Sequence, residues 1–206
     1  MPRTRRRDRA SDGGWSPIAD RLVERVSRAG RTRALAAAGL RAGERVLLIG
    51  VGTGLDLPLL PVGVIAVGVD RSEAMLARAR ARLPLRGREI TLVLGDAQEL
   101  PVATGAFDAA VLDLILSVVP EPWRALAEAL RAVRPGGRLV GYDKFLRDGA
   151  RPSWMRRLAN VATTRWGGTD INLRLGDLVA GQPCTVDLDE PAALRGLYRV
   201  VRLQRA

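Results

Sequence analysis

The chain has 206 residues, 47% of them hydrophobic, and a formal net charge of +11. This length suits one well-packed domain, and no apolar run approaches the roughly 20 residues that a membrane-spanning helix needs. The single cysteine, Cys184, excludes an internal disulfide and a thiolate metal cluster, and the lack of histidine removes the commonest general base and metal ligand. We therefore expect no metal site. The N-terminus lacks the apolar core of a signal peptide, so the expected location is cytoplasmic.

Almost all of the positive charge is arginine, because Lys144 is the only lysine. The arginines are scattered along the chain, which favours solvated basic faces over a dedicated nucleic-acid surface. Residues 1–14 are basic and end in glycine, and we expect them to form a disordered tail. Residues 15–206 are expected to form a single domain.

The first predicted element is a helix from residue 18 to about residue 40. Apolar residues recur there at the spacing of one helix face, at Ile18, Leu22, Val26 and Ala29. The chain then alternates between apolar runs and helical patterns. The apolar runs predict five strands, at residues 46–49, 64–69, 90–94, 108–112 and 138–142.

The connections between these strands are predicted from turn and helix signals. Pro58 and Pro61 leave room for only about one turn of helix after the first strand. Ser72 is placed to cap a helix over residues 72–83. The sequence Arg134–Gly137, RPGG, predicts a tight turn into the fifth strand. Before it, a further helix is predicted from an apolar stripe made of Trp123, Leu126, Leu130 and Val133.

The final third of the chain has a different pattern. Residues 145–181 predict a helical insert that covers the substrate, with helices near 153–166 and 170–180, the second ended by Gly181. Residues 184–189 and 198–205 alternate as strands do and are expected to pair at one edge of the sheet. The chain as a whole therefore predicts an α/β three-layer sandwich, with a mostly parallel seven-stranded sheet and an antiparallel C-terminal hairpin at its edge.

A glycine-rich loop follows the first strand: Gly50, Val51, Gly52, Thr53 and Gly54. In an open parallel sheet, ligands bind beyond the carboxyl ends of the strands, and glycines there let the backbone approach a ligand closely. The spacing is G-x-G-x-G, whereas a dinucleotide fold uses G-x-G-x-x-G and a phosphate loop ends in Gly-Lys-Ser/Thr. A tight strand-to-helix turn without a ligand remains the alternative.

Acidic residues stand at the ends of the next two strands. Asp70 is placed to accept hydrogen bonds from both hydroxyls of a ribose, although an aspartate before a helix also serves helix initiation. Asp96 is placed to accept from an exocyclic amine, and Ala97 to offer a backbone amide to a purine. Together with the glycine loop, these strand ends present what an adenosine ligand requires.

The segments "VLLIGVGTG", "GVDRSEAML", "GDAQELP", "FDAAVLDLILSVVPEP" and "RPGGRLVGYDKF" resemble the class I S-adenosylmethionine-dependent methyltransferase family, in its order and spacing. The resemblance, of the methyltransferase type 11 kind, is strong over residues 40–145. It implies a Rossmann-like fold, methyltransferase activity and S-adenosyl-L-methionine as cofactor. The implied cofactor-binding residues are Gly50, Val51, Gly52, Thr53, Gly54, Asp70, Arg71, Asp96, Ala97 and Asp113, with Asp113 on the methyl side.

The chain departs from the family pattern at three places, one of which is the unusually short helix after the glycine loop. The family commonly carries an acidic residue two positions before the first glycine, where this chain has Leu48, which removes part of the expected anchor for the amino-acid end of the cofactor. An NPPY-type motif is missing after the fourth strand, which disfavours methylation of adenine N6 in nucleic acid. The candidate catalytic residues are Asp113 and Asp143 as proton acceptors, with Tyr142 as an orienting donor. For each of them, local bonding to the backbone at a strand end is the alternative.

The acceptor is expected to be a small molecule or a lipid. The loop and the "LSVVPEP" segment are also similar to small bacterial phospholipid N-methyltransferases, which implies phosphatidylethanolamine as one such acceptor. The basic tail and the 153–166 helix would then contact an anionic membrane surface peripherally, although that helix would equally serve as a lid packed on the sheet. The rival is a nucleic-acid-binding protein on an inactive methyltransferase-like fold. Sparse aromatic residues disfavour an RNA methyltransferase.

Overall fold

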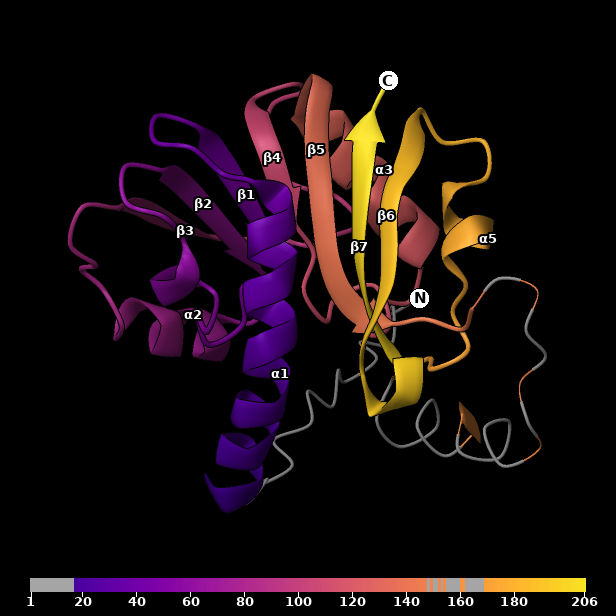
Figure 1. The fold of residues 1–206 in the computed structure, drawn as a ribbon. Helices are drawn as coiled ribbons and strands as arrows, with labels where there is room; N and C mark the ends of the chain where they lie inside the picture. The colour runs from indigo at the N-terminus through magenta and orange to yellow at the C-terminus, as the bar shows by residue number, and fades with distance from the viewer. Residues whose placement is uncertain (1–16, 148, 150–151, 153, 155–159, 162–168) are drawn as a thin grey trace, which may run out of the picture.

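The computed structural model describes residues 17–147, 149, 152, 154, 160–161 and 169–206. Its centre is a seven-stranded sheet in the order β3-β2-β1-β4-β5-β7-β6 (Figure 1). The five strands from β3 to β5 are parallel, and β7 pairs antiparallel with both β5 and β6. The strands are β1 Arg45–Ile49, β2 Ile65–Asp70, β3 Glu89–Leu94, β4 Phe107–Val111, β5 Val133–Lys144, β6 Cys184–Ala193 and β7 Tyr198–Arg205.

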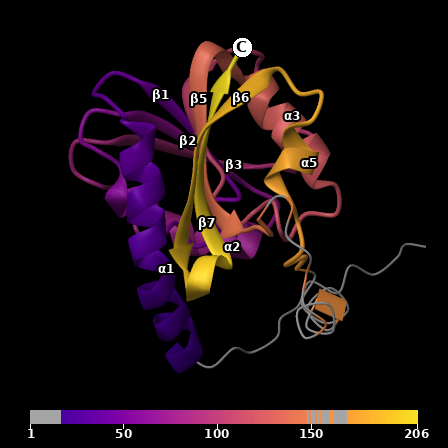
Figure 2. The same ribbon diagram turned by 45° about the vertical axis from the view of Figure 1, so that its right-hand side comes forward.

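Helices cover both faces of the sheet, as strand β1 requires, because it is buried at every residue after Arg45. Alternate residues of a strand point to opposite faces. Val46 and Leu48 accordingly pack in one cluster with α1, the short helix η1 and α2, while Leu47 and Ile49 pack in another with α3 and α5. Figure 2 shows α1 on one side of the sheet and α3 and α5 on the other. The helices are α1 Pro17–Ala38, η1 Leu57–Leu59, α2 Glu73–Arg80, α3 Pro122–Ala132 and α5 Leu175–Val179.

The predicted fold class is confirmed, including the antiparallel hairpin at the C-terminal edge. The single helical turn after β1 is present as η1, and Ser72 caps α2 by accepting a hydrogen bond from the backbone N–H of Met75 at 3.4 Å. Helix α1 ends at Ala38, slightly earlier than predicted. The reason is that Gly39 takes a left-handed φ of +56° and donates to the carbonyl of Ala36.

Three predicted boundaries are wrong. The RPGG sequence, residues 134–137, lies inside β5 as an irregularity in its pairing, because Val133 lies opposite Phe107 and Arg138 opposite Ala109. The second helix of the insert is limited to α5, and β6 continues beyond residue 189 because it keeps pairing with β7 across two register shifts. The predicted tail, residues 1–14, lies outside the described residues, as does most of the predicted helix 153–166.

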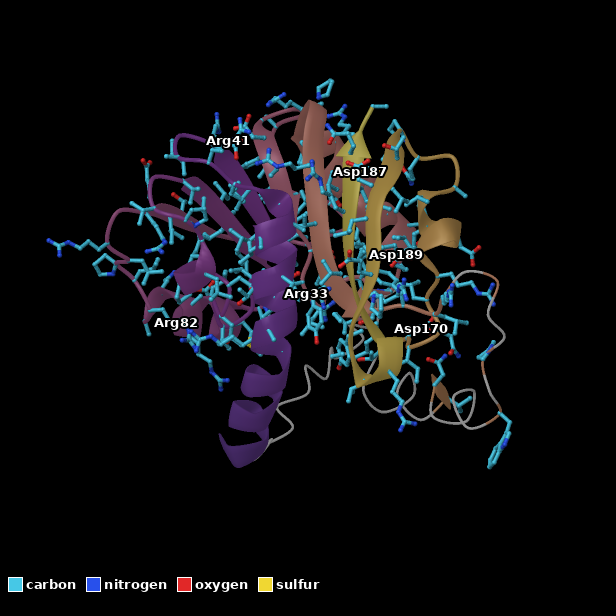
Figure 3. The ribbon with its side chains drawn as sticks, in the orientation of Figure 1. Arg33, Arg41, Arg82, Asp170, Asp187 and Asp189 are labelled. Carbon is cyan, nitrogen blue, oxygen red and sulfur yellow. The ribbon has the colours of Figure 1, made fainter. Side chains whose placement is uncertain are left out.

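Many of the scattered arginines are engaged in ion pairs between elements rather than gathered in one basic face. Arg138 of β5 binds Glu44 at 2.6 Å, in the turn before β1, and Arg199 of β7 binds Asp189 of β6 at 2.5 Å. Figure 3 shows labelled charged side chains on several separate parts of the surface. Within the described part of the chain, no helix has the length and apolar character needed to cross a bilayer.

Candidate active site

A cavity of about 650 Å³ lies at the edge of the sheet where the parallel strands end. This volume falls in the range of small-molecule sites. Its walls come from the loops after β1, β2, β3 and β4, because the carboxyl ends of parallel strands meet at one edge of a sheet. The predicted residues that line it are Gly50, Gly52, Asp70, Arg71, Asp96, Ala97 and Asp113.

Two of the five residues of the glycine-rich loop line the cavity. Gly50 and Gly52 have left-handed φ values of +71° and +54°. A Cβ on Gly50 would lie 2.6 Å from Cδ1 of Ile115 on the opposite wall. Gly54 is instead required for packing, since a Cβ there would lie 2.8 Å from Cδ1 of Leu57. Val51 is 4% exposed and belongs to the hydrophobic core.

Asp70 fixes the glycine loop and also lines the cavity. Its Oδ2 accepts a hydrogen bond from the backbone N–H of Gly52 at 2.8 Å, and its Oδ1 accepts from that of Ser72 at 2.9 Å. The carboxylate therefore joins the loop after β1 to the start of α2. Each carboxylate oxygen has a second lone pair, so these two bonds leave acceptor capacity for a ligand. The two roles considered for this residue, helix initiation and ligand binding, are compatible.

The third strand end presents Asp96 and Ala97 on the cavity wall. The Oδ1 of Asp96 accepts from the backbone N–H of Gln98 at 2.8 Å, which fixes the exposed carboxylate in a turn. Gly95, just before it, lies where a Cβ would be 2.7 Å from the ring of Pro101. This close packing holds the turn against the end of β2.

Asp113 is buried at the cavity wall, and only one of its two carboxylate oxygens has a hydrogen-bond partner among the described residues. Its Oδ1 accepts from the backbone N–H of Tyr142 at 2.8 Å, whereas its buried Oδ2 has no hydrogen-bond partner among the described residues. Burial raises the pKa of this carboxyl well above its usual range, the nearby Asp56 raises it further, and Arg31 opposes both effects.

The other two candidate catalytic residues do not line the cavity. Asp143 is fully buried, and its carboxylate accepts from the backbone N–H groups of Ser117 at 3.1 Å and Lys144 at 2.7 Å. Tyr142 is fully buried too, stacked on Tyr198 with 5.2 Å between ring centroids, and burial raises its pKa to about 12. The geometry matches the alternative interpretation, in which Asp143 bonds the local backbone. Thr53 does not line the cavity either.

Arg31 is a cavity residue that the sequence did not reveal. It comes from α1 and pairs with Asp56 at 2.6 Å, and both side chains are largely buried. Leu48, at the position where the family commonly has an acid, is 1% exposed and lies in the core. Asp56 sits in the apolar sequence "LDLPLLP", and an isolated acid in such a context was the available signal for a buried cationic partner.

The segment after β4 forms an apolar wall that was also not predicted. Leu114, Ile115, Val118 and Val119 line the cavity. Leu114 has a left-handed φ of +60°, which is uncommon for a leucine and marks local strain of the kind found at binding sites. A hydrogen bond stabilises this conformation, because the backbone N–H of Leu114 donates to the carbonyl of Tyr142 at 2.8 Å.

These residues suit an adenosyl ligand with a charged amino-acid end. The glycines bring bare backbone to the wall, and the strand-end carboxylates of Asp70 and Asp96 line separate parts of the cavity. Asp113 adds a third carboxylate, whose Oδ2 has no hydrogen-bond partner among the described residues. Within the described part of the chain, no group of three metal-binding side chains is present.

Comparisons with known proteins agree with this geometry. A family model described as "Methyltransferase domain" matches residues 47–141. A phosphatidylethanolamine N-methyltransferase from Cereibacter sphaeroides is 37% identical over 195 residues, which cover 93% of this chain and 94% of that protein. A demethylmenaquinone methyltransferase from Beutenbergia cavernae is 41% identical over 116 residues, which cover 56% of this chain and only 47% of that protein.

The fold is also found among solved structures. An S-adenosylmethionine-dependent methyltransferase from Thermotoga maritima superposes with a TM-score of 0.63 at 25% identity, covering 90% of this chain and 92% of that one. The match to the curated relative extends over nearly the whole of both chains, well beyond the residues of the family model. The chain therefore belongs to the class I S-adenosylmethionine-dependent methyltransferases, enzymes of Rossmann-like fold that use S-adenosyl-L-methionine as their cofactor.

Proposed function

We propose that this methyltransferase acts on the amine of a phospholipid such as phosphatidylethanolamine. The observation that carries the methyl-transfer part is the 650 Å³ cavity in which the glycine loop, two strand-end acids and Asp113 converge. The acceptor is supported by the relative named phosphatidylethanolamine N-methyltransferase, whose match extends over almost the whole of both chains.

Different cavity residues would bind different parts of the cofactor. Asp70 would bind the ribose hydroxyls, Asp96 and Ala97 would hold the adenine, and Gly50 and Gly52 would let the chain approach closely. S-Adenosylmethionine supplies a methyl group bound to a sulfonium, and its sulfur is a good leaving group because it departs as a neutral thioether when a nucleophile attacks the methyl carbon in line. Because the leaving group is already activated, the protein contributes mainly by positioning and by excluding water.

An amine acceptor also requires a group on the protein that removes a proton from it. An alkyl amine is protonated near neutral pH and must lose that proton before its lone pair can attack. Asp113 is suited to accept it, because its Oδ2 has no hydrogen-bond partner among the described residues, the residue lines the cavity, and burial raises the pKa of its carboxyl. Ile115 and Val118 on the neighbouring wall keep the site apolar.

Access to a lipid acceptor requires the enzyme to visit a membrane surface. We infer that the basic segment 1–14 and the basic helix expected at 153–166 provide a peripheral contact with anionic lipid, and that residues 15–206 act as one domain. Sedimentation with anionic vesicles tests this contact. The protein should pellet with vesicles at low salt and be released as salt rises, and equal recovery with and without vesicles would remove the membrane part.

A methylation assay tests the acceptor directly. Purified protein is incubated with S-adenosylmethionine and vesicles that contain phosphatidylethanolamine, and the lipids are analysed by mass spectrometry. The expected result is the addition of about 14 mass units per methyl group, with none in vesicles of phosphatidylcholine alone. Unchanged phosphatidylethanolamine, while S-adenosylhomocysteine still binds, would overturn this acceptor.

A quinone is the second candidate acceptor. It is favoured by the demethylmenaquinone methyltransferase relative, although that match covers only about half of each chain. A parallel arm of the assay with a demethylmenaquinone separates the two, because the quinone is methylated at carbon and carries no amine. The nucleic-acid-binding rival is tested by calorimetry, in which it predicts no heat on titration with S-adenosylhomocysteine.

A further inference from the structure

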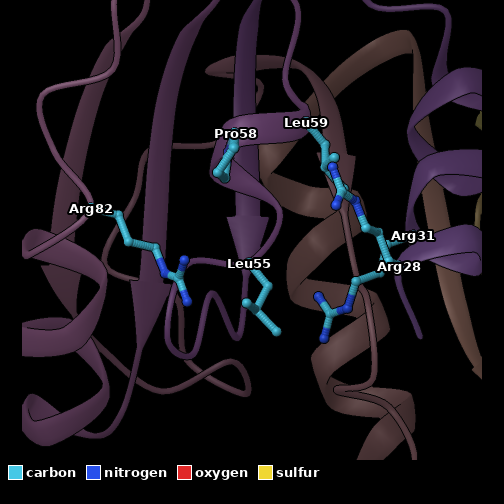
Figure 4. A pocket seen from close by; sticks show the side chains of 6 residues that line it. All are labelled: Arg28, Arg31, Leu55, Pro58, Leu59 and Arg82. Carbon is cyan, nitrogen blue, oxygen red and sulfur yellow. The ribbon is translucent and has the colours of Figure 1, made fainter. Parts of the chain in front are cut away.

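A second, smaller pocket lies between α1 and the loop that follows β1. It has a volume of about 160 Å³ and is lined by six residues: Arg28, Arg31, Leu55, Pro58, Leu59 and Arg82. Figure 4 shows the guanidinium groups of Arg28 and Arg82 approaching the space beside Leu55 from opposite sides. Three of the six lining residues are therefore arginines, and none is acidic.

The charges of this pocket are incompletely balanced. Arg31 is paired with Asp56 at 2.6 Å. Among the described residues, no carboxylate forms an ion pair with Arg28 or Arg82, and both are exposed. Like charges that converge in this way repel one another, and an anion bound between them relieves the repulsion. The pocket therefore favours an anionic ligand.

One of the two free arginines is held in position by the protein itself. The Nε of Arg82 donates to the backbone carbonyl of Thr53 at 2.7 Å. This bond uses neither terminal nitrogen, so it orients the guanidinium without consuming the donors that face the pocket. Arginine forks of this kind match the oxygens of a phosphate group in two parallel hydrogen bonds.

Arg31 connects this pocket to the cofactor cavity, because it lines both. A phosphate held here would lie next to the wall that carries Asp113. In an ethanolamine phospholipid, two methylene groups separate the phosphate from the amine. A headgroup can thus place its phosphate among the arginines and its amine in the cavity, while Leu55, Pro58 and Leu59 meet its apolar part.

We propose that Arg28, Arg31 and Arg82 bind the phosphodiester of the lipid acceptor and so hold its amine at the cofactor cavity. The lipid assignment rests on the proposed function, whereas the phosphate site rests on the pocket alone. The small volume of the pocket suits a single phosphate group rather than the backbone of a nucleic acid.

The test compares Arg28→Gln and Arg82→Gln with Arg86→Gln, an exposed arginine that lies outside the pocket and loses the same charge. Methylation is measured with phosphatidylethanolamine in detergent micelles. We expect the KM for the lipid to rise about tenfold in Arg28→Gln and in Arg82→Gln, with kcat within about twofold of the native value, as removal of one charged hydrogen-bonding group implies. Arg86→Gln should behave as the native protein. An unchanged KM in Arg28→Gln overturns the inference and leaves the proposed function standing.

Binding experiments without catalysis separate the two claims. Calorimetry with S-adenosylhomocysteine present compares glycerophosphoethanolamine, ethanolamine and inorganic phosphate. We expect glycerophosphoethanolamine to bind most tightly and to lose about tenfold in affinity in Arg28→Gln. Loss of this binding in Arg28→Gln without any lipid methylation by the native protein supports the phosphate site and refutes the acceptor. Equal affinity for inorganic phosphate and glycerophosphoethanolamine overturns the lipid assignment. The assignment is also overturned if Arg28→Gln weakens the binding of a single-stranded oligonucleotide and leaves the binding of glycerophosphoethanolamine unchanged.

Discussion

Gly52→Ala should separate the ligand-binding role of the glycine loop from its role in the fold. Gly52 and Gly39 have nearly the same left-handed backbone, with φ of +54° and +56°, and a Cβ at either position meets no close neighbour: the nearest atom to Gly52 is a carbonyl oxygen at 3.9 Å. Only Gly52 lines the cofactor cavity. Gly39→Ala is therefore a matched control with the same backbone cost and no contact with the ligand.

The expected magnitudes follow from these geometries. An alanine in the left-handed region costs about 1 to 2 kcal/mol, which for a chain of this size lowers the melting temperature by about 2 to 8 °C. Both variants should show this loss. The methyl group of Gly52→Ala should also enter the space that the cofactor needs, and overpacking of about 1 to 3 kcal/mol weakens binding by about 5- to 150-fold.

Scanning fluorimetry and calorimetry with S-adenosylhomocysteine measure both quantities. Native protein and Gly39→Ala should bind with the same affinity, and both should be stabilised by the ligand. The reasoning is refuted if Gly52→Ala binds S-adenosylhomocysteine as tightly as Gly39→Ala does, because the loop would then not face the ligand.

Three further substitutions test individual parts of the site. Asp70→Asn replaces one acceptor oxygen by a donor that faces the N–H of Gly52 or Ser72. Affinity for S-adenosylhomocysteine, measured by calorimetry, should therefore fall about 10- to 100-fold. An affinity equal to that of the native protein would exclude a role for Asp70 in the site. Asp113→Asn should lower the methylation rate about 10²-fold or more. Burial raises the pKa of Asp113 in the folded state, so native stability should decline as pH rises from the unfolded-state pKa of about 4 towards the raised folded-state value, by about 1.4 kcal/mol for each pH unit between them. Melting curves of the variant should show a smaller decline, because burial also raises the pKa of Asp143 and that contribution remains. Tyr142→Phe removes a buried hydroxyl that has no partner among the described residues, so melting temperature and methylation rate should be unchanged or higher; a large loss of rate would restore Tyr142 as a catalytic residue.

The cavity residues at or just after the ends of β1, β2 and β3 could be predicted because their positions follow from the strand pattern alone. A buried parallel strand must end where its apolar run ends, so Gly50, Asp70 and Asp96 had to meet at one edge of the sheet. The signal was strong because three strand ends each carried a residue suited to the same ligand.

Arg31 and the Tyr142–Asp143 pair depend on tertiary contacts that local pattern does not encode. Arg31 lies on a helix before the first strand, and only the packing of α1 on the sheet brings it to Asp56. The other two residues lie near the carboxyl end of β5, where ligand-facing residues are expected. In the structure, β5 continues to Lys144 and pairs with β7, with Tyr142 opposite Val200 and Asp143 opposite Arg199. The pairing with an added antiparallel strand encloses these side chains.

The central claim, that the cofactor occupies the cavity between the glycine loop and the two strand-end acids, is tested most directly by a crystal structure of the protein with S-adenosylhomocysteine. The account predicts ribose hydroxyls within hydrogen-bond distance of Asp70, adenine beside Asp96 and Ala97, and the sulfur atom on the side of the cavity that carries Asp113. Well-defined ligand density at any other place on the molecule, with this cavity free of it, would contradict the account.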